Sequence, residues 1–499
     1  MASYTDLEYL KLPKFRRFFL KLWDFIASIP FRLLVLIFAI GRFFRAFGYT
    51  VAGIFKTIVL TWKYGDYKTR TSYFIMGFGN LARGQILRGV LFLLFEVAFG
   101  VYMGTIGVYY IKDLGTLGTI ERVTGRGGKI IEWGQNSFDI LLYGVLTIIF
   151  IVALAVTWYI NVKQNKIAQE ILATGKPLKS GKQDLNSLVD DQFHKTLLAL
   201  PLLGILIFTV LPVFFMILIA FTNYDSGHYP PNRLFTWVGG DNFGALFSSG
   251  GSGFGSAFGQ ILLWTLIWAF FATFTNYFLG MIVAMIINKK GIKLKKLWRT
   301  VLVISIAIPQ FISLMYVGRM FEADGLINSL FQSWGWITEP LRFWTDPMWA
   351  RITVIIINIW VGIPYLMLIT SGILMNIPAD LYESAKIDGA SPVKMYMKIT
   401  LPYMLFVTGP YLLTSFIGNM NNFNVIYLLS GGNPTNGDLY NGTAGSTDLL
   451  ITWLYKLTVN NQDYKLASVI GIMVFVVVAV ISVIIYNAIP SMKNEEDFQ

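Results

Sequence analysis

The chain has 499 residues, of which 55% are hydrophobic and 14% are charged, and it contains no cysteine. This composition is typical of a polytopic membrane protein, because soluble domains carry roughly a quarter of charged residues. Disulfides and thiolate metal sites are excluded. The net charge of +12 does not call for a nucleic-acid partner, because Lys and Arg collect on the cytoplasmic loops of membrane proteins.

Residues 1–70 are predicted to form a cytoplasmic amphipathic region. The apolar stretch from Phe31 to Leu60 contains several basic residues, among them Arg32, Arg42 and Lys56. Mixed aromatic and basic residues are typical of a helix that lies in the membrane interface. A further transmembrane span through this stretch is the alternative. No cleavable signal peptide is expected.

Eight later segments have the length and apolarity to cross a bilayer, which takes about 20 residues each. They are residues 90–111, 139–160, 197–221, 260–287, 300–320, 352–374, 403–429 and 467–489. The sequence therefore predicts an all-α membrane protein. The expected regions are two peripheral spans with a basic cytoplasmic loop (71–196), a transmembrane core (197–490) and a cytoplasmic tail (491–499).

Orientation follows from the distribution of Lys and Arg. With the N-terminus inside, the inner segments hold about three times as many Lys and Arg residues as the outer segments. Both termini are therefore predicted to be cytoplasmic, in a multi-pass protein of the plasma membrane. The loop at 161–196 is expected to be a mobile inner connector, and the loop at 222–259 lies outside.

One inner loop, residues 376–402, carries many charges between two apolar spans. Hydrocarbon cannot hold so many charges, so this loop must lie at the membrane surface. Pro378 suits the first turn of one short helix, Gly389 interrupts it, and Pro392 suits the start of a second. We expect a helix–glycine–helix that a soluble partner can grip.

This loop resembles the EAA loop of permeases from binding-protein-dependent ABC importers, which reads Glu-Ala-Ala, three residues, Gly, nine residues, Ile-x-Leu-Pro. The matching residues are Glu383, Ser384, Ala385, Asp388, Gly389, Ile399, Leu401 and Pro402. Only Ser384 departs from the pattern. The resemblance implies a type I ABC permease fold, with Glu383 as the polar contact to a separate ATPase subunit and Gly389 as a hinge.

Two spans carry polar and aromatic residues, whereas a span that faces lipid would carry mainly aliphatic side chains. They include Asn358, Trp360, Gly362, Pro364 and Tyr365 in 352–374, and Thr414, Ser415, Asn419, Asn421, Asn422 and Asn424 in 403–429. Pro364 and Gly362 predict a local break in the first span. Neutral hydrogen-bonding groups beside aromatic rings suit a sugar, whereas an anion would call for Arg or Lys. The alternative is that the Asn residues only join helices.

The resemblance extends over about residues 195–490 to the larger permease subunits of maltose and maltodextrin importers. It is carried by 360–365, 415–423 and 445–450. It implies sugar contacts at Trp360, Gly362, Tyr365, Ser415, Asn419 and Asn422. Gly418 stands where a family member has a Phe that packs on a sugar ring, which leaves the identity of the sugar open. The short outer loop implies a lipid-anchored external sugar-binding protein.

The expected function is therefore that of a permease subunit for maltodextrin, without catalytic residues or a metal site. The expected partners are a second, similar permease, two ATPase subunits that bind ATP and Mg, and the external binding protein. Another oligosaccharide or a polyol-type solute is the nearer alternative. An ion-coupled transporter is the more distant one, but Glu96 is expected to face other helices rather than relay ions. Residues 175–182 resemble a phosphate loop with wrong spacing.

Overall fold

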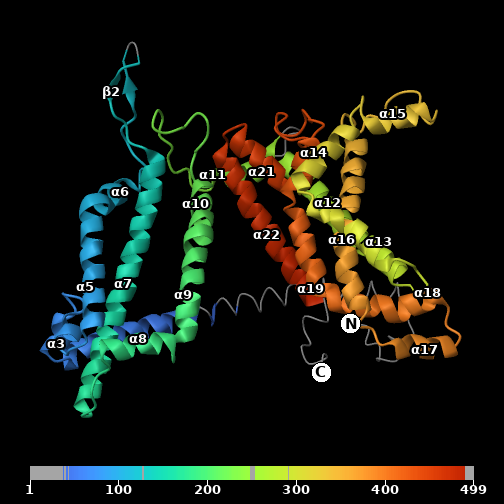
Figure 1. Ribbon diagram of the computed structural model, residues 1–499. Coiled ribbons are helices and arrows are strands. Elements are labelled where there is room, and N and C mark those ends of the chain that lie inside the picture. The colour runs from blue at the N-terminus through green and yellow to red at the C-terminus, as the bar shows by residue number, and fades with distance from the viewer. Residues whose placement is uncertain are drawn as a thin grey trace, which may run out of the picture. The chain divides into compact units, whose positions relative to one another are not determined.

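The computed structural model describes residues 38, 41–42, 44–125, 128–247, 253–289 and 291–488. These residues are mainly helical (Figure 1). Internal contacts divide the chain into two compact units. Unit 1 comprises residues 1–112 and 143–201, and unit 2 comprises residues 113–142 and 202–499.

The helices are, in chain order, α3 (Tyr67–Thr71), α4 (Phe78–Leu81), α5 (Ile86–Tyr102), α6 (Val108–Asp113), α7 (Ser137–Ala173), α8 (Gly181–Val189), α9 (Phe193–Ile205), α10 (Leu211–Ile219), α11 (Asp241–Gly244), α12 (Phe254–Asn288), α13 (Lys295–Ala307), α14 (Gln310–Met320), α15 (Leu326–Ser333), α16 (Pro347–Leu374), α17 (Ala379–Ile387), α18 (Pro392–Met395), α19 (Leu401–Met420), α20 (Phe423–Ser430), α21 (Leu450–Val459) and α22 (Tyr464–Ala488). Short π-helical turns at Met103–Gly107, Leu206–Val210 and Tyr396–Thr400 continue α5, α9 and α18, and a 3-10 turn at Ala245–Phe247 follows α11. The two strands described, β1 (Val123–Thr124) and β2 (Ile130–Glu132), form an antiparallel pair.

Within the described residues, seven helical segments are long and apolar enough to cross a membrane. An eighth candidate is the pair α13 and α14, which is bent by 92°. The prediction of an all-α protein with about eight spans is therefore confirmed. The predicted span at 300–320 is the bent pair, and the predicted span at 403–429 ends early, because α19 stops at Met420.

The N-terminal prediction falls partly outside the described residues, which cover only positions 38, 41–42 and 44–70 of that region. Residues 44–64 form a helix whose side chains are mostly exposed. This helix is not among the seven candidate spans. Its placement in the membrane interface stays a prediction, as do the predicted domain boundaries.

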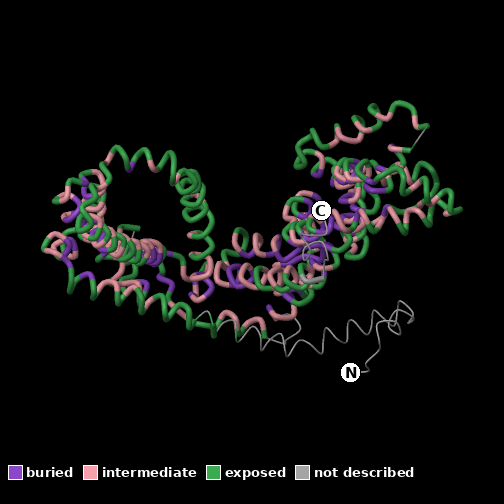
Figure 2. Tube along the Cα trace, turned by 90° about the horizontal axis from the view of Figure 1, so that it is seen from below, coloured by how far each residue is buried: buried purple, intermediate pink, exposed green. Residues whose placement is uncertain are grey.

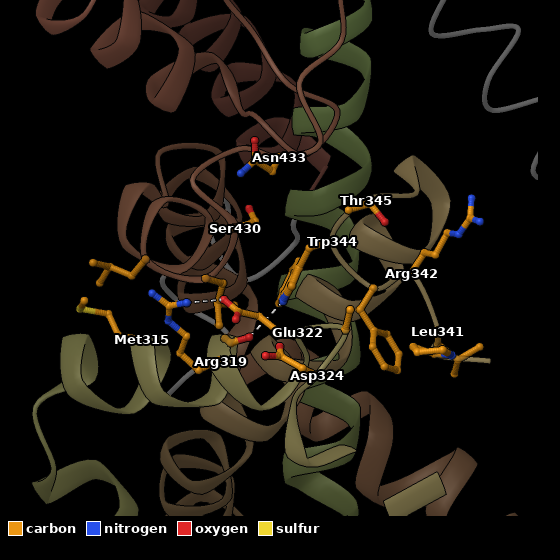
Figure 3. A pocket seen from close by; sticks show the side chains of 16 residues that line it. Met315, Arg319, Glu322, Asp324, Leu341, Arg342, Trp344, Thr345, Ser430 and Asn433 are labelled. Atoms are coloured by element: carbon orange, nitrogen blue, oxygen red, sulfur yellow. Dashed lines mark hydrogen bonds and ion pairs between the residues drawn. The ribbon is translucent and has the colours of Figure 1, made fainter. Parts of the chain in front are cut away.

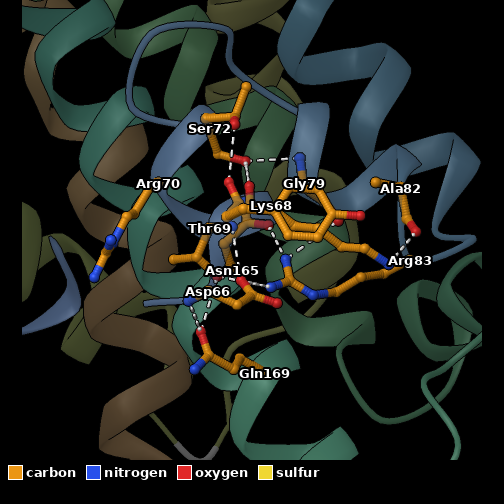
Figure 4. A network of polar contacts seen from close by, with 12 residues as sticks. Asp66, Lys68, Thr69, Arg70, Ser72, Gly79, Ala82, Arg83, Asn165 and Gln169 are labelled. Carbon is orange, nitrogen blue, oxygen red and sulfur yellow. Dashed lines mark hydrogen bonds and ion pairs between the residues drawn. The ribbon is translucent and has the colours of Figure 1, made fainter. Parts of the chain in front are cut away.

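A buried arginine organises the polar interior of unit 1 (Figure 4). The Arg83 side chain is 1% exposed, and its Nη2 donates to Asp66 Oδ1 at 2.6 Å. Its Nη1 donates to Asn165 Oδ1 on α7 at 2.8 Å. Burial alone would raise the pKa of Asp66, but hydrogen bonds from Thr69 and the charge of Arg83 outweigh it and lower that pKa. Because Arg83 binds both Asp66 and Asn165, the network holds residues 66–83 against α7. Removing one partner of such a buried pair would leave an uncompensated charge.

The carboxylate of Glu96 also binds within unit 1. Its Oε2 accepts a hydrogen bond from the backbone N–H of Met76 at 2.8 Å. A polar group inside a span is tolerated when it faces protein rather than lipid. This contact agrees with the expectation that Glu96 faces other segments of the protein.

Most of the expected connector at 161–196 is helical. Helix α7 continues to Ala173, and α8 follows after a short turn. The Ser180 side chain accepts from Gln183 N, and the Gln183 side chain accepts from Ser180 N, which makes a capping box at the start of α8. Arg88 binds Asp184 of α8 at 2.5 Å. The stretch at 175–182 that resembles a phosphate loop is therefore the connection from α7 to α8, and only its last two residues belong to α8.

Helix α12 lies at the centre of unit 2 and packs against α16 and α19. Buried positions gather where the helices of a unit face one another, and exposed positions lie on their outer sides (Figure 2). Close approach requires small residues. A Cβ at Gly280 would lie 2.7 Å from Leu366 Cβ, and one at Gly362 would lie 2.2 Å from Asn276 Nδ2. The α12–α16 contact therefore depends on these two glycines.

A second set of contacts holds the loop that precedes α21. Lys456 Nζ lies 2.6 Å from Asp448 Oδ2, and the Asp448 side chain is fully buried. Burial raises the pKa of Asp448, and the Lys456 ammonium offsets only part of this rise. Trp264 Nε1 of α12 donates to Thr447 O at 3.1 Å, and Arg351 Nε of α16 donates to Ser446 O at 2.8 Å. The loop thereby ties together the ends of α12, α16 and α21.

The α12–α16 contact can be tested by Gly280→Val, with Gly259→Val on the same helix as the matched control. A Cβ at Gly259 meets nothing within 4 Å, whereas the one at Gly280 meets Leu366 and the backbone of Met367. Gly280→Val should lower the free energy of unfolding on the order of 1–3 kcal/mol more than the control. Thermal unfolding in detergent measures this. Equal midpoints for the two variants would contradict close packing at Gly280.

Candidate functional site

The break between α13 and α14 starts at Pro309. Proline lacks a backbone N–H, and it drives the preceding residue into an extended conformation. Ile308 has φ −80° and ψ 128°, α13 ends at Ala307, and α14 begins at Gln310. Carbonyls at the end of α13 and N–H groups at the start of α14 therefore lose their helical partners. At membrane depth such a break is tolerated only against protein or a water-filled cavity.

A cavity of about 360 Å³ lies at this break. Both sides of the bend and one face of α16 line it. Its walls include Ser305, Gln310 and Ser313 from the bent pair, and Trp360, Val361 and Tyr365 from α16. Among the residues that the structure describes, no acidic or basic side chain lines the cavity. The lining therefore combines neutral hydrogen-bonding groups with two aromatic side chains.

Several polar side chains of this lining are free to bind a ligand. Within the part of the chain that the structure describes, the side chains of Gln310, Ser313 and Trp360 make no hydrogen bond to protein. Trp360 is 49% exposed and Tyr365 is 52% exposed. Unpaired polar groups are costly in hydrocarbon, so these groups need water or a ligand as a partner.

The predicted residues of α16 separate into two sets. Trp360 and Tyr365 line the cavity, whereas Gly362 faces Asn276 of α12 and allows the two helices to approach. The predicted break at Pro364 is wrong, because α16 continues from Pro347 to Leu374 without interruption. The break lies instead at Pro309, in the neighbouring helical pair.

The predicted residues of α19 lie outside this cavity lining. Asn419 Nδ2 donates to Thr273 Oγ1 of α12 at 3.0 Å. Asn422 Oδ1 accepts from Val425 N at 3.2 Å and caps the start of α20, and its Nδ2 is 3.4 Å from Asn419 Oδ1. Both amides therefore bind protein groups, as expected for residues that join helices. Their predicted sugar contacts stay predictions.

Ser415 and Gly418 lie on the same helix. Helix α19 packs against α16 as well as α12. Gly418 is exposed, and a Cβ built there meets nothing within 4 Å. Open space remains where the resembling family member carries a Phe.

The charged inner loop forms the predicted helix–glycine–helix. Helix α17 follows Pro378, and α18 starts at Pro392. Gly389 has φ 72°, a left-handed conformation that favours glycine. The hydroxyls of Tyr382 and Thr400 lie 2.8 Å apart and join the two helical parts.

Most of this loop is open to solvent. Glu383, Ser384, Asp388 and Gly389 are exposed and Ala385 is half-buried. Ile387 is 87% exposed and Val393 is 72% exposed. Figure 1 shows α17 and α18 at the end of unit 2 opposite α15. Apolar side chains beside charges are typical of a surface that a protein partner covers. The sequence pattern did not single out Ile387.

A second, larger cavity of about 550 Å³ lies near the end of unit 2 that carries α15 (Figure 3). Arg319 Nη1 donates to Glu322 Oε1 at 2.8 Å, and Trp344 Nε1 donates to Gly318 O at 3.0 Å. Arg319, Glu322 and Trp344 of its lining thus already have protein partners. None of the predicted site residues lines it. Among the described residues, no group of His, Asp and Glu has the arrangement of a metal site.

Comparisons with known proteins connect these features to a family. A model of the family described as "Binding-protein-dependent transport system inner membrane component" matches residues 276–492. The maltodextrin transport system permease protein MdxF of Bacillus subtilis is 33% identical over 430 residues, 85% of this chain and 95% of that protein. The galactooligosaccharides transport system permease protein GanP of the same organism is 33% identical over 424 residues, 84% of this chain and 97% of that protein.

Other matches cover less of the chain. The maltose/maltodextrin transport system permease protein MalF of Salmonella typhimurium is 37% identical over 211 residues, 41% of this chain and 40% of that protein. A solved structure, of a bacterial ABC transporter involved in the import of the acidic polysaccharide alginate, matches 61% of this chain and 97% of its own chain. Its TM-score is 0.48 and its sequence identity is 23%.

The capping contact of Asn422 gives a test that separates structure from binding. Asn422→Ala removes the side-chain acceptor for Val425 N, and loss of such a cap costs about 1 kcal/mol. Asn424→Ala, at an exposed position two residues further on, is the matched control. Thermal unfolding of the purified protein should show a lower midpoint for Asn422→Ala alone. Identical midpoints would show that the cap contributes nothing to stability.

Proposed function

The chain belongs to the family of binding-protein-dependent transport system inner membrane components, and from this premise we propose that it is the permease subunit of an ATP-driven maltodextrin importer. The observation that carries the proposal is the match to MdxF over 85% of the chain. The substrate would cross the cytoplasmic membrane along unit 2, past the cavity at the α13–α14 break.

The chemistry of the cavity supports a neutral sugar as the substrate. Its lining holds an amide, hydroxyls and two aromatic rings, and no charged side chain. Amides and hydroxyls pair with sugar hydroxyls, and aromatic rings cover the apolar faces of pyranoses. A phosphate or carboxylate would call for Arg or Lys in the path. Trp360 and Tyr365 are the proposed sugar contacts in the cavity. The further proposed contacts are Gly362 on α16, Ser415 and Asn419 on α19, and Asn422 at the start of α20.

A different oligosaccharide is the second candidate. GanP, named for galactooligosaccharides, matches the chain as extensively as MdxF does. Neutral groups in the cavity suit either sugar. Counter-transport of labelled maltose, maltotriose and raffinose, with a galactooligosaccharide added, separates the candidates. The proposal predicts exchange of maltotriose, and exchange of galactooligosaccharide alone would overturn the assignment to maltodextrin.

The inner loop supports a partner that supplies the energy. We assign Glu383, Ser384, Ala385, Asp388 and Gly389 to contact with one of two ATPase subunits, which bind ATP and Mg. The exposed Ile387 and Val393 would be covered by the same partner. ATP binding closes the ATPases, the loop moves with them as a lever, and the cavity opens outward. Hydrolysis then resets the transporter, so this chain needs no cofactor.

The remaining partners follow from the same proposal. A second, similar permease would complete the translocation path, and an external, lipid-anchored sugar-binding protein would deliver the substrate. Both termini of the chain would then be cytoplasmic. An ion-coupled mechanism is disfavoured, because Glu96 accepts a hydrogen bond from Met76 N instead of standing in a relay of acids.

Tyr365→Ala tests the sugar path, with Tyr316→Ala as the matched control. Tyr316 is 75% exposed on α14 and does not line the cavity. Loss of the Tyr365 ring should raise the KM for maltotriose uptake by roughly two- to tenfold, while assembly with the ATPase is retained. Uptake into proteoliposomes that contain the complete transporter measures this. Wild-type KM in Tyr365→Ala would place the sugar path elsewhere.

The lever is tested by Glu383→Lys and Gly389→Pro. Reversing the charge removes the proposed polar contact, and proline cannot adopt the left-handed conformation of Gly389. Each variant should keep membrane insertion but lose sugar-stimulated ATP hydrolysis and uptake by at least about tenfold. Glu339→Lys reverses an exposed charge outside the inner loop and should behave as wild type. If both inner-loop variants still couple ATP hydrolysis to sugar uptake as the wild type does, the loop does not act as a lever.

A further inference from the structure

We propose that the turn between α12 and α13, together with the start of α13, is a binding surface for the headgroups of anionic phospholipids. The basic turn, as we name this surface, comprises the side chains of Lys289, Lys293, Lys296, Leu297 and Trp298. The inference goes beyond the proposed function, because it depends neither on the sugar nor on the source of energy. It follows from an unbalanced local charge, from unpaired ammonium groups and from exposed apolar side chains beside them.

The sequence around the turn carries positive charge that no acidic residue nearby in the chain balances. No Asp or Glu occurs between Asp241 and Glu322, a stretch that includes all of α12 and α13. Clusters of Lys and Arg directly beside a membrane span attract the anionic headgroups of the adjacent leaflet. The basic residues of this stretch that cluster at the turn are Lys289, Lys290, Lys293, Lys295, Lys296 and Arg299.

Two of these basic residues serve the fold. Lys295 Nζ donates to the backbone oxygen of Asn288 at 3.1 Å, and Arg299 donates through Nη2 to the side-chain oxygen of Asn288. Asn288 Nδ2 in turn donates to Ser371 Oγ of α16 at 2.6 Å. These contacts fix the start of α13 against the ends of α12 and α16.

Three other lysines keep their ammonium groups free of protein partners. Lys289, Lys293 and Lys296 are exposed. Among the residues that the structure describes, their side chains form no hydrogen bond and no ion pair. Because the contacts of Asn288 fix the start of α13, a folded segment presents these three charges together. They are therefore available to a negatively charged ligand.

Apolar side chains next to these lysines place the basic turn at the edge of the bilayer. Leu297, Val301 and Ile304 lie on one face of α13, and each is more than half exposed. Trp298 is 54% exposed on the first turn of the helix. Tryptophan is enriched at the level of the headgroups, where a helix enters the bilayer. Ser371 belongs to the last turn of α16, so the basic turn lies at the end of unit 2 that carries α17 and α18 (Figure 1).

A phospholipid matches this surface in both charge and polarity. Its phosphate accepts hydrogen bonds from lysine ammonium groups, and its acyl chains continue along the exposed apolar face of α13. A free phosphate ion would leave Leu297 and Trp298 uncovered. A soluble acidic protein could pair with the lysines, but it would not reach the apolar face that runs on into the membrane.

The test uses the complete transporter in nanodiscs made of phosphatidylcholine, with or without added phosphatidylglycerol. The variant that combines Lys289→Gln, Lys293→Gln and Lys296→Gln removes the three free charges. The measured quantity is the rise in the midpoint of thermal unfolding caused by phosphatidylglycerol. The wild type should gain roughly 2–4 °C, and the variant should lose at least half of this gain. Each protein is compared with itself in two lipids, so a change in its basal stability cancels.

A matched control removes the same net charge at another site. Lys176, Lys179 and Lys182 are exposed where α7 connects to α8, and their combined change to Gln should leave the gain as in the wild type. Replacing the three lysines of the basic turn with Arg keeps the charge and should also keep the gain. About 0.5 M NaCl should remove the gain from the wild type, because salt screens exposed charges.

Other outcomes would overturn the proposal. The lipid surface is wrong if the Gln variant of the basic turn gains as much from phosphatidylglycerol as the wild type does. It is also wrong if soluble glycerol phosphate gives the same gain in phosphatidylcholine nanodiscs, because the ligand is then a free phosphate. Loss of the ATPase subunits with an unchanged lipid gain would assign the surface to a protein partner instead. If the triple variant does not assemble, Lys293→Gln alone decides, with a smaller loss expected.

Discussion

Inside a bilayer each polar group must find a partner in protein, in water or in a ligand, and this constraint governs the architecture of the chain. The polar side chains of helix α12 find such partners in specific protein contacts along the helix. Trp264 donates to Thr447 O, Trp268 donates to Asn419 O, and Tyr277 binds Thr408. These contacts join α12 to the loop before α21 and to α19, so the polar groups of α12 also hold the frame around which unit 2 is built.

The cavity at the α13–α14 break departs from this pattern, and its position follows from the same frame. The glycine contacts between α12 and α16 hold α16 straight against its neighbour. Away from these glycines, Trp360 and Tyr365 remain half-exposed beside the bend. Asn419 thus binds Thr273 of α12, whereas Gln310 and Ser313 at the bend bind no protein group among the described residues. The division matches what a translocation path needs, because groups that bind a passing solute must not be satisfied by the protein.

Much of this arrangement could be predicted from the sequence. Apolar length identified the spans, and Pro378, Gly389 and Pro392 marked the two short helices of the inner loop. The helix break could not be placed, since Pro309 and Pro364 both follow an isoleucine in an apolar segment. Only packing distinguishes them: α16 continues through Pro364 because it packs closely on α12, and the chain bends at Pro309 instead. For the same reason the sequence did not place Gln310 in a cavity lining, and it did not show that Asn422 caps α20.

The central claim is that the sugar passes through the cavity at this bend, and the cysteine-free chain allows a direct test. Single cysteines are introduced by Tyr365→Cys in the cavity and by Tyr316→Cys outside it, in the complete transporter. The rate of labelling by a maleimide is then measured with and without saturating maltotriose. The account predicts that maltotriose slows labelling at position 365 and leaves position 316 unchanged. Equal labelling rates at position 365 with and without the sugar, in a transporter that still imports it, would contradict the account.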